Sequence, residues 1–469
     1  MPIGDVYPEI AITLTAVLSL VWAISAPQRL QWVCALVALT GIGVAGALVT
    51  AQIGTVRLSF AGTFALDEVG AWAQLMILGG TAFCVFLSPG WFRSDPRHGE
   101  FYTILLFSAL GAMMMVGAAD LLQLVMGVLL SSVTGYTLAA YHRDWGLSVE
   151  AGMKYFLLGA LANALLVTGV VLVFGMLGSS GYDAIADRLA EGNAASPLLY
   201  AGFALLAVGV AFKLGAAPAH AWVPDVAEGA PAPAAAFLTV VPKIGAAIAL
   251  ARIVELVPPD TLAIRPLIAV LAVVTMTLGN LAALWQEDVR RLIGWSSVSQ
   301  AGYILMAVTV LGLSDHALPA LLTFVGSYAI SNLAAFAVIT HLRGRTKLAD
   351  YVGLATERPV AAAVLTLSFL SLVGIPPLVG FVGKLTLFIA TIQGGYAWLA
   401  VVAAANTVAS LFYYARVIGP VYFGAASKPV AVLDGWSSAA LWLGGLAVVI
   451  VTLAAGPAFI VFGKATLLP

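Results

Sequence analysis

Long apolar segments recur from one end of the chain to the other, and they restrict its fold more than any other feature of the sequence. A helix needs about 20 mostly apolar residues to cross the hydrocarbon core of a bilayer. The segments of this kind are 8–26, 31–51, 67–88, 100–118, 120–140, 149–176, 197–222, 231–255, 266–285, 290–312, 316–341, 359–393, 396–424 and 435–462. The sequence therefore predicts an all-α polytopic membrane protein with about 14 transmembrane helices.

The composition excludes several other classes of protein. Only 9% of the residues are charged, whereas soluble domains have about 25%. The apolar runs are continuous, which argues against the alternating strands of a membrane β-barrel. A net charge of −1 gives no indication of a nucleic-acid partner. The sequence has no nucleotide loop, cofactor fingerprint or metal-ligand spacing, so we expect no metal and no cofactor in this chain.

The distribution of basic residues between the connections predicts the orientation, because cytoplasmic loops are enriched in lysine and arginine. With both termini outside, the inner connections carry Arg29, Arg93, Arg97, Arg143, Arg290, Arg291, Arg343, Arg345, Lys347, Arg358 and Lys428. The outer connections carry only Arg57, Arg188, Arg265 and Lys464. We therefore expect both termini outside, which means periplasmic in a bacterium.

Two of the apolar segments contain helix breakers at matching places. The seventh segment is interrupted at Pro218 and the twelfth at "VGIPPLVGFVGK", residues 373–384. Segments five apart run in opposite directions, so helices 4–8 and 9–13 are predicted to be two inverted five-helix repeats. Broken helices at matching places in inverted halves point to the ion path of a transporter.

This pattern divides a single membrane domain, 1–469, into four parts. They are the N-terminal helices (1–99), the first repeat (100–255), the second repeat (266–424) and a C-terminal helix (435–462).

Three lysines lie within the apolar segments rather than between them. Lys213 and Lys384 lie beside the two breaks, and Lys243 lies in the middle of the eighth segment. A lysine at the centre of a bilayer costs about 2.5–3.5 kcal/mol on insertion scales. Burial lowers the pKa of a lysine and a nearby carboxylate raises it, so a buried lysine can alternately hold and release a proton. Lys154 and Arg416 lie nearer to helix ends, where a side chain that reaches the interface is an equally good explanation.

Polar side chains would have to connect such lysines. The candidates are His220 in the broken seventh segment, Ser297, Ser299 and Gln300 in the tenth, and Asn332 in the eleventh. Each of the serine and amide side chains taken alone is more typical of a helix–helix hydrogen bond. A histidine within a membrane more often has a functional role.

Several motifs around these residues make the chain resemble a known family. They are "EAGMKYFLLGALANA" (150–164), "FKLGAAPAHAWVPDVAEGAPAPAAAFLTVVPK" (212–243), "DVRRLIGWSSVSQAGYILMA" (288–307), "SYAISNLAAFAVI" (327–339) and "SLVGIPPLVGFVGKLTLF" (371–388). With them the chain resembles the antiporter-like membrane subunits of NADH-quinone oxidoreductase, respiratory complex I, and within that family the subunit N group.

The resemblance implies a function and a setting. The chain would be a proton-translocating subunit without redox chemistry of its own, in a translocase that transfers electrons from NADH to quinone. NADH, FMN, iron–sulfur clusters and quinone would belong to other subunits, and the neighbours would be M- and K-like membrane subunits. The setting implied is a bacterial inner membrane. Lys213 matches the lysine of the family's helix seven, Lys243 the connecting lysine of helix eight and Lys384 the terminal lysine of helix twelve. His220 matches the family's helix-seven histidine, and we add Lys154 as a further candidate for proton translocation.

The sequence departs from the family pattern at two places. Ala219 and Ala221 stand where the family usually has bulky side chains. Leu129 occupies the position of a helix-five glutamate that pairs with the helix-seven lysine in the family. Either Lys213 carries protons without that glutamate, with water or His220 as a neighbour, or this channel is weakened.

Two other functions stay open. One is a subunit of an Mrp-type Na⁺/H⁺ antiporter or of a hydrogenase-like complex, against which "PDVAEGAP" (224–231) argues. The other is a purely structural membrane scaffold, for which substitution of Lys243 or Lys384 would be silent.

Overall fold

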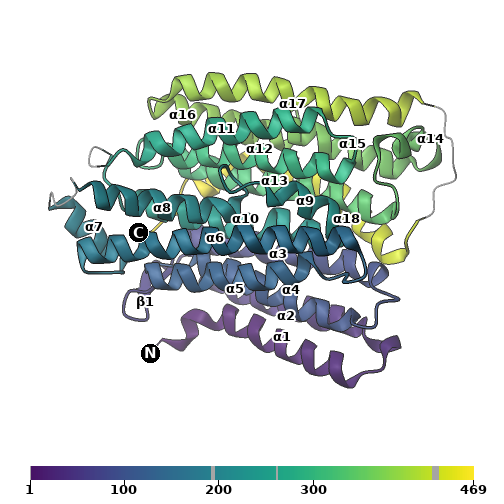
Figure 1. Cartoon of the computed structure of the whole chain (residues 1–469), viewed down its shortest axis with the longest axis horizontal. Helices are drawn as coiled ribbons and strands as arrows, with labels where there is room; N and C mark the ends of the chain where they lie inside the picture. Colours follow the sequence, from purple (N-terminus) through teal and green to yellow (C-terminus); the bar gives the residue numbers. More distant parts are fainter. Residues whose placement is uncertain (1, 192–195, 260–261, 425–431, 469) are drawn as a thin grey trace.

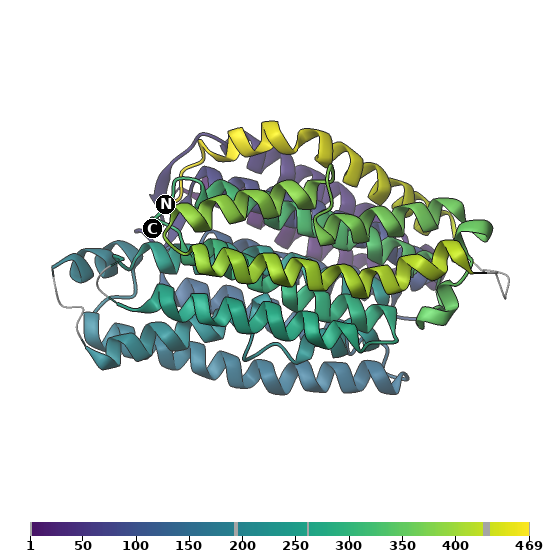
Figure 2. The same cartoon turned by 90° about the horizontal axis from the view of Figure 1, so that it is seen from above.

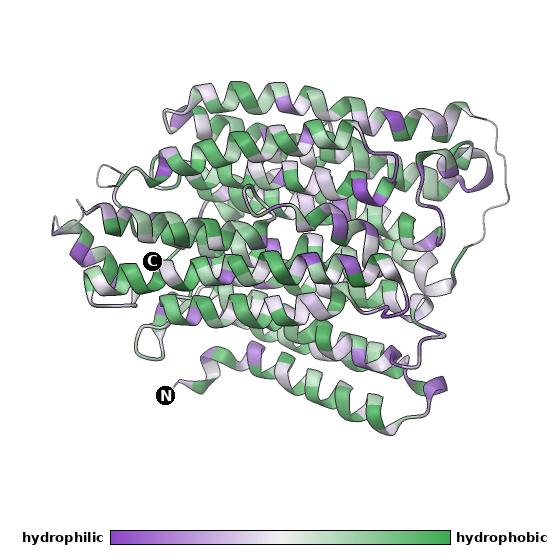
Figure 3. Cartoon of the chain, in the orientation of Figure 1, coloured by the Kyte–Doolittle hydropathy of each residue, from purple (hydrophilic) through white to green (hydrophobic). Residues whose placement is uncertain are grey.

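The computed structural model describes residues 2–191, 196–259, 262–424 and 432–468, and these residues form one helical bundle (Figure 1). Lys428, which contributes to the predicted inner charge, lies outside the described residues. Both ends of the described chain lie at the same end of the bundle in the two perpendicular views (Figures 1 and 2). Hydrophobic residues cover the length of the helices, and hydrophilic residues gather mainly near the helix ends and in the connections (Figure 3).

Twelve helices of the described chain are long and apolar enough to cross a membrane. They are α1 (Tyr7–Ser25), α2 (Val33–Gln52), α3 (Glu68–Trp91), α4 (His98–Val116), α5 (Leu121–Ala139), α6 (Gly146–Leu177), α8 (Pro197–Leu214), α10 (Ala232–Glu255), α11 (Ile264–Leu284), α13 (Ala317–His341), α17 (Ala397–Phe423) and α18 (Gly435–Phe462). The predicted segments agree with these helices to within a few residues, except that segment seven also includes the interruption after α8.

Two predicted segments differ from this set. The tenth is the helix α12 (Val289–Thr309), which is less apolar because it carries Arg290, Arg291 and several polar side chains. The twelfth is divided into two shorter apolar helices, α15 (Pro359–Val373) and α16 (Val379–Gln393).

Short helical elements lie before α1 and between the longer helices. They are η1 (Ile3–Val6), η2 (Gln28–Leu30), α7 (Tyr182–Ala190), α9 (Trp222–Gly229), η3 (Leu348–Tyr351) and α14 (Leu354–Glu357). The all-α prediction needs one small correction, because β1 (Arg57–Ser59) and β2 (Phe64–Leu66) form an antiparallel hairpin. Strands this short carry too little alternation to be recognised in an apolar sequence.

The first interruption follows α8. Gly215 closes this helix in the left-handed conformation, with φ of +68°, which glycine adopts without steric cost. The chain then passes the cis peptide bond Ala217–Pro218 and enters α9 at Trp222. The backbone N–H of Ala217 donates to Oγ1 of Thr275 on α11 at 3.0 Å. A group that the broken helix leaves without a partner is therefore satisfied by the neighbouring helix, as a low-dielectric surrounding requires.

The second interruption, between α15 and α16, follows the same plan. Gly374 closes α15 with φ of +91°, and the cis peptide bond Pro376–Pro377 precedes α16. The N–H of Gly380 donates to Oγ of Ser371 at 3.2 Å. Both interruptions that the sequence predicted are thus present.

The innermost helices are α10 and α13. The membrane-crossing part of α10 is entirely buried within the chain, whereas most of α18 is exposed at the periphery. Polar side chains on α10 and α13 are therefore shielded by other helices on every side, and any charge there must find its partners within the protein.

Candidate functional site

Lys243 lies at the centre of the bundle and is held by α12. Its side chain is buried, and Nζ donates to the carbonyl oxygen of Ser297 at 2.6 Å and to the Oγ of Ser297 at 2.7 Å. The Oγ of Ser297 lies 2.7 Å from Oη of Tyr328 on α13. Oη of Tyr328 in turn donates to the carbonyl of Thr239 at 2.7 Å. Three helices therefore meet around one ammonium group through uncharged oxygen acceptors.

The interrupted helix α8 reaches the same place. A Cβ added to Gly215 would lie 3.6 Å from Nζ of Lys243, so the turn that ends α8 passes directly beside this ammonium. Asn332, which the sequence singled out, donates through Nδ2 to Oγ1 of Thr239 at 3.2 Å. Ser297 and Asn332 thus both belong to the surroundings of Lys243.

Lys384 uses the second interruption. Its Nζ donates to the carbonyl of Val373, the last residue of α15, at 2.9 Å. The ammonium also lies over the ring of Tyr303, 4.5 Å from the centroid, where the negative face of the ring attracts a cation. A carbonyl freed at the end of a broken helix is an acceptor that an unbroken helix could not offer.

A small cavity lies between the surroundings of Lys243 and those of Lys384. It has a volume of about 10 Å³, and Gln300, Ser327, Tyr328 and Lys384 contribute to its lining. A space of about 10–15 Å³ holds one water molecule. Tyr328, which contacts Ser297, and Lys384 thus line the same cavity. Gln300 is itself anchored by donating to the carbonyl of Leu372 at 3.2 Å.

Lys213 lies in a different and more aromatic surrounding. Its side chain is fully buried, and Nζ lies 3.3 Å from Oη of Tyr155 on α6. The rings of Tyr155 and Phe212 are 5.5 Å and 5.8 Å from Nζ. Trp222 of α9 stacks on the ring of Tyr155 at 4.1 Å and donates to the carbonyl of Phe212 at 3.1 Å.

The three buried lysines share one electrostatic property. None of the ion pairs in the described part of the chain includes Lys213, Lys243 or Lys384. Hydroxyl groups, carbonyls and rings surround them instead of carboxylates. A buried ammonium with only neutral partners is costly to keep charged, and this suits a group that gives up its proton.

Leu129 does not face this arrangement. It is 39% exposed and shares the outer face of α5 with Leu122, Met126 and Val133. The inner face of α5 carries Ser132 instead, which is fully buried.

His220 is directed toward α12 rather than toward Lys213. Its ring lies 5.7 Å from that of Trp295, and its Nδ1 is shielded from solvent without a hydrogen-bond partner in the described chain. No hydrogen bond or ring contact among the described residues joins it to Lys213, so the two predicted neighbours are not brought together.

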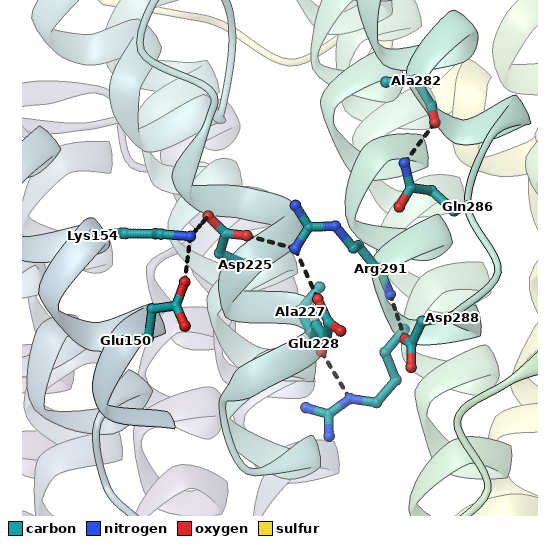
Figure 4. Close-up of polar contacts among 10 residues, drawn as sticks. Glu150, Lys154, Asp225, Ala227, Glu228, Ala282, Gln286, Asp288 and Arg291 are labelled. Carbon is teal, nitrogen blue, oxygen red and sulfur yellow. Dashed lines mark hydrogen bonds and ion pairs between the residues drawn. The ribbon is translucent and has the colours of Figure 1, made fainter. Parts of the chain in front are cut away.

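Lys154 belongs to a group of charged side chains contributed by α6, α9 and α12 (Figure 4). Its side chain is 44% exposed and pairs with Glu150 at 2.7 Å and Asp225 at 3.0 Å. Arg291 approaches from α12 and pairs with Asp225 at 2.5 Å and Glu228 at 2.8 Å. The motif "PDVAEGAP" thus supplies the acids that join α6, α9 and α12. Sequence reasoning missed these pairs, although the acids and Arg291 stand in the motifs that carry the resemblance.

Arg252 forms a buried ion pair that sequence reasoning also missed. It contacts Asp67 at 2.6 Å, and both side chains have no exposed surface. Arg252 also donates to the carbonyl of Leu468 at 2.5 Å, and Asp67 accepts from the N–H of Leu468 at 2.9 Å. The sequence did contain one indication of this pair, because Arg252 lies inside the apolar segment 231–255. Arg416, by contrast, donates to the carbonyl of Leu284 near a helix end.

No group of three or more His, Cys, Asp or Glu side chains that could hold a metal ion occurs in the described ranges.

Comparison with known proteins first defines the class. Residues 118–410 match the sequence model of the family described as "NADH:quinone oxidoreductase/Mrp antiporter, TM". This range includes both interrupted helices and the three buried lysines, so the matched part of the chain is an antiporter-like membrane domain.

Closer relatives specify the family. NADH-quinone oxidoreductase subunit N of Mycobacterium sp. (strain JLS) is 46% identical over 395 residues, which cover 84% of this chain and 83% of the relative. The chain therefore belongs to the NADH-quinone oxidoreductase subunit N family.

Two solved structures share the fold. A chain of respiratory complex I from Thermus thermophilus has a TM-score of 0.81 and 28% identity, with 97% of this chain and 98% of that chain covered. A chain of the Mrp complex from Dietzia sp. DQ12-45-1b has a TM-score of 0.84 at 20% identity, with coverages of 99% and 97%. The second likeness concerns the fold alone.

Proposed function

We propose that this chain is the proton-translocating subunit N of a membrane-bound NADH-quinone oxidoreductase, and that protons pass through its buried lysines. The observation that carries the proposal is the connection from Lys243 through Ser297 and Tyr328 to a water-sized cavity lined by Lys384. Proton transfer needs donors and acceptors within hydrogen-bond reach or one water apart. Family membership supports the assignment to this complex.

Each predicted residue has a role in this proposal. Lys213 receives the proton near the first interruption, Lys243 connects the two halves and Lys384 releases the proton beside the second. Ser297, Gln300 and Asn332 orient the groups between them. Lys154 positions the carboxylates of Glu150 and Asp225, which attract protons at the surface. His220 lies beside the path at the interruption of α8.

The topology follows the same proposal. The chain crosses the membrane 14 times, with α8–α9 and α15–α16 each counted as one interrupted helix and α12 included. The interruptions occupy matching places in two inverted repeats, 100–255 and 266–424. Both termini face the periplasm in this proposal, because the connections on the opposite side of the membrane carry most of the arginines.

The partners are those of subunit N in such a complex. Membrane subunits of the M and K kind lie beside this chain in a bacterial inner membrane. NADH, FMN, the iron–sulfur clusters and quinone are held by other subunits, and electron transfer there drives translocation here. The assembly acts as a translocase, while this chain carries out no redox step.

The alternative is a subunit of an Mrp-type Na⁺/H⁺ antiporter or of a hydrogenase-like complex, which the likeness of fold to the Mrp complex keeps open. Purification of the tagged chain from its native membrane decides between them. Co-purification of NADH-oxidising iron–sulfur subunits supports the complex I assignment, whereas Na⁺-dependent H⁺ exchange without those subunits would contradict it.

Substitution of Lys384 by two different residues tests the translocation role. Lys384→Ala removes both the charge and the proton, whereas Lys384→Arg keeps a charge that is not released at physiological pH. We expect both variants to lower NADH-driven proton uptake by liposomes that contain the complex. If Lys384→Arg pumped normally, the role of Lys384 would be electrostatic and not proton exchange.

A further inference from the structure

Among the described residues, no carboxylate pairs with Lys213, yet a set of uncharged polar groups lies around it. Nζ of Lys213 is within 3.3 Å of Oη of Tyr155. The ring of Tyr155 is fixed on one face by Trp222, at 4.1 Å, and meets the edge of Tyr136 at 4.9 Å. Tyr155 is therefore held in place by α9 and α5 while its hydroxyl group is directed at the ammonium.

The two tyrosine hydroxyl groups lie in space left by two glycines. A Cβ on Gly159 of α6 would lie 1.9 Å from Oη of Tyr136, which is closer than any real contact. A Cβ on Gly135 of α5 would lie 3.3 Å from Oη of Tyr155. Both positions are thus open to the hydroxyl groups because no side chain fills them.

Further polar atoms of this interface are unused. Nδ2 of Asn163 donates to Oη of Tyr136 at 3.4 Å, but Oδ1 of Asn163 has no partner in the described chain and is shielded from solvent. The Oγ of Ser132, one turn before Tyr136 on α5, is also shielded; it lies beside the hydroxyl group of Tyr136 but has no hydrogen bond of good geometry in the described chain. Buried polar atoms are hydrogen-bonded in the great majority of proteins, to protein or to ordered water. These two atoms are therefore available to bind a small polar ligand such as water.

We propose that Tyr155, Tyr136, Asn163 and Ser132, here called the hydroxyl cluster, hold water beside Lys213 and take the place of the missing carboxylate. This proposal rests on the proposed function. Tyr155 orients the ammonium. An N–H bond of Lys213 breaks as an O–H bond forms on a water of the cluster, and that water passes one of its protons onward. Lysine becomes a neutral amine, the cluster gains no net charge, and nothing is oxidised or reduced.

The cluster differs physically from a carboxylate partner. A carboxylate stabilises the ammonium and holds its proton more firmly, whereas neutral hydroxyl groups leave the lysine able to lose it. The outward position of Leu129 fits this difference, because the inner face of α5 offers Ser132 to the same interface.

A double-mutant cycle in the purified complex, reconstituted in liposomes, tests the proposal. Tyr155→Phe keeps the ring stacked on Trp222 and removes the hydroxyl group. We expect NADH-driven proton uptake to fall about tenfold, which equals the loss of about 1.4 kcal/mol from one hydrogen bond to a charged group. Tyr351→Phe is the matched control, because Tyr351 is equally buried and its hydroxyl group donates to the carbonyl of Arg345 in the connection that follows α13.

The result in a Lys213→Ala background separates positioning from packing. We expect Tyr155→Phe to have no further effect there. A further loss in that background, or normal pumping by Tyr155→Phe, would overturn the role of the hydroxyl cluster. Lys384→Ala measured alongside keeps the two proposals apart. Loss of pumping in Lys384→Ala with none in Tyr155→Phe rejects the cluster only, and normal pumping in both rejects the proposed function as well.

Discussion

Ser297→Ala tests the connection between Lys243 and Lys384 most directly. Nζ of Lys243 donates to two atoms of Ser297, and the substitution removes only the Oγ, at 2.7 Å, while the carbonyl at 2.6 Å stays. A hydrogen bond to a charged group contributes about 1.5–3 kcal/mol. The lower value applies because one acceptor remains, and it corresponds to about a tenfold slower transfer step.

The same substitution also removes the contact between Ser297 and Tyr328, although Tyr328 keeps its bond to the carbonyl of Thr239. The assay is the rate of NADH-driven proton uptake and of quinone reduction by the complex in liposomes. Thr309→Val is the control, because Thr309 lies on the same helix, is equally buried, and its hydroxyl group donates only to the carbonyl of Leu305 in the preceding turn, at 2.9 Å. Uptake within about twofold of the unaltered complex for Ser297→Ala, or equal losses in both variants, would refute the reasoning.

Three further predictions concern stability and pH. Arg252→Met leaves Asp67 buried without its partner, and we expect the complex to lose about 3–5 kcal/mol of stability in thermal unfolding. Asp225→Asn weakens two partly exposed ion pairs, so we expect a loss of only about 1 kcal/mol that shrinks at high salt. In the connection between α5 and α6, burial lowers the pKa of His142, opposed by the charge of Asp95. Neutral His142 accepts from Trp91 at 3.0 Å. The unfolded state then binds more protons, so the contribution of neutral His142 to stability is fully present above about pH 6.5 and falls as the pH drops below it. The melting temperatures of the unaltered complex and of His142→Phe, measured across this pH range, check the prediction.

Local features of the sequence determined the helices. Each crossing is specified by its own run of apolar residues, since a helix satisfies its backbone groups internally and needs only lipid or other helices around it. The interruptions at Gly215 and Gly374 were likewise local, because each glycine is followed within three residues by a proline, and both residue types disfavour a continuous helix. The presence of three lysines inside apolar runs could be read in the same way.

The partners of those lysines were decided by packing. The contact of Lys243 with Ser297 joins residues 54 positions apart, and that of Lys213 with Tyr155 joins residues 58 apart. No periodicity within either segment encodes which face of one helix meets which face of another. Sequence reasoning therefore named Ser297 and offered water or His220 as a neighbour of Lys213, but it gave no indication of the contact between His220 and Trp295.

The sequence by itself determined that this chain spans a membrane, where its helices break and which charges lie inside it. These properties follow from the free energy of transferring each segment into an apolar surrounding. The tertiary structure alone decided that the lysines have neutral oxygen partners, that Leu129 faces outward and that Tyr155 stands beside Lys213. Such pairings depend on how helices far apart in the sequence rotate and pack against one another, and the hydropathy of a single helix does not contain that information.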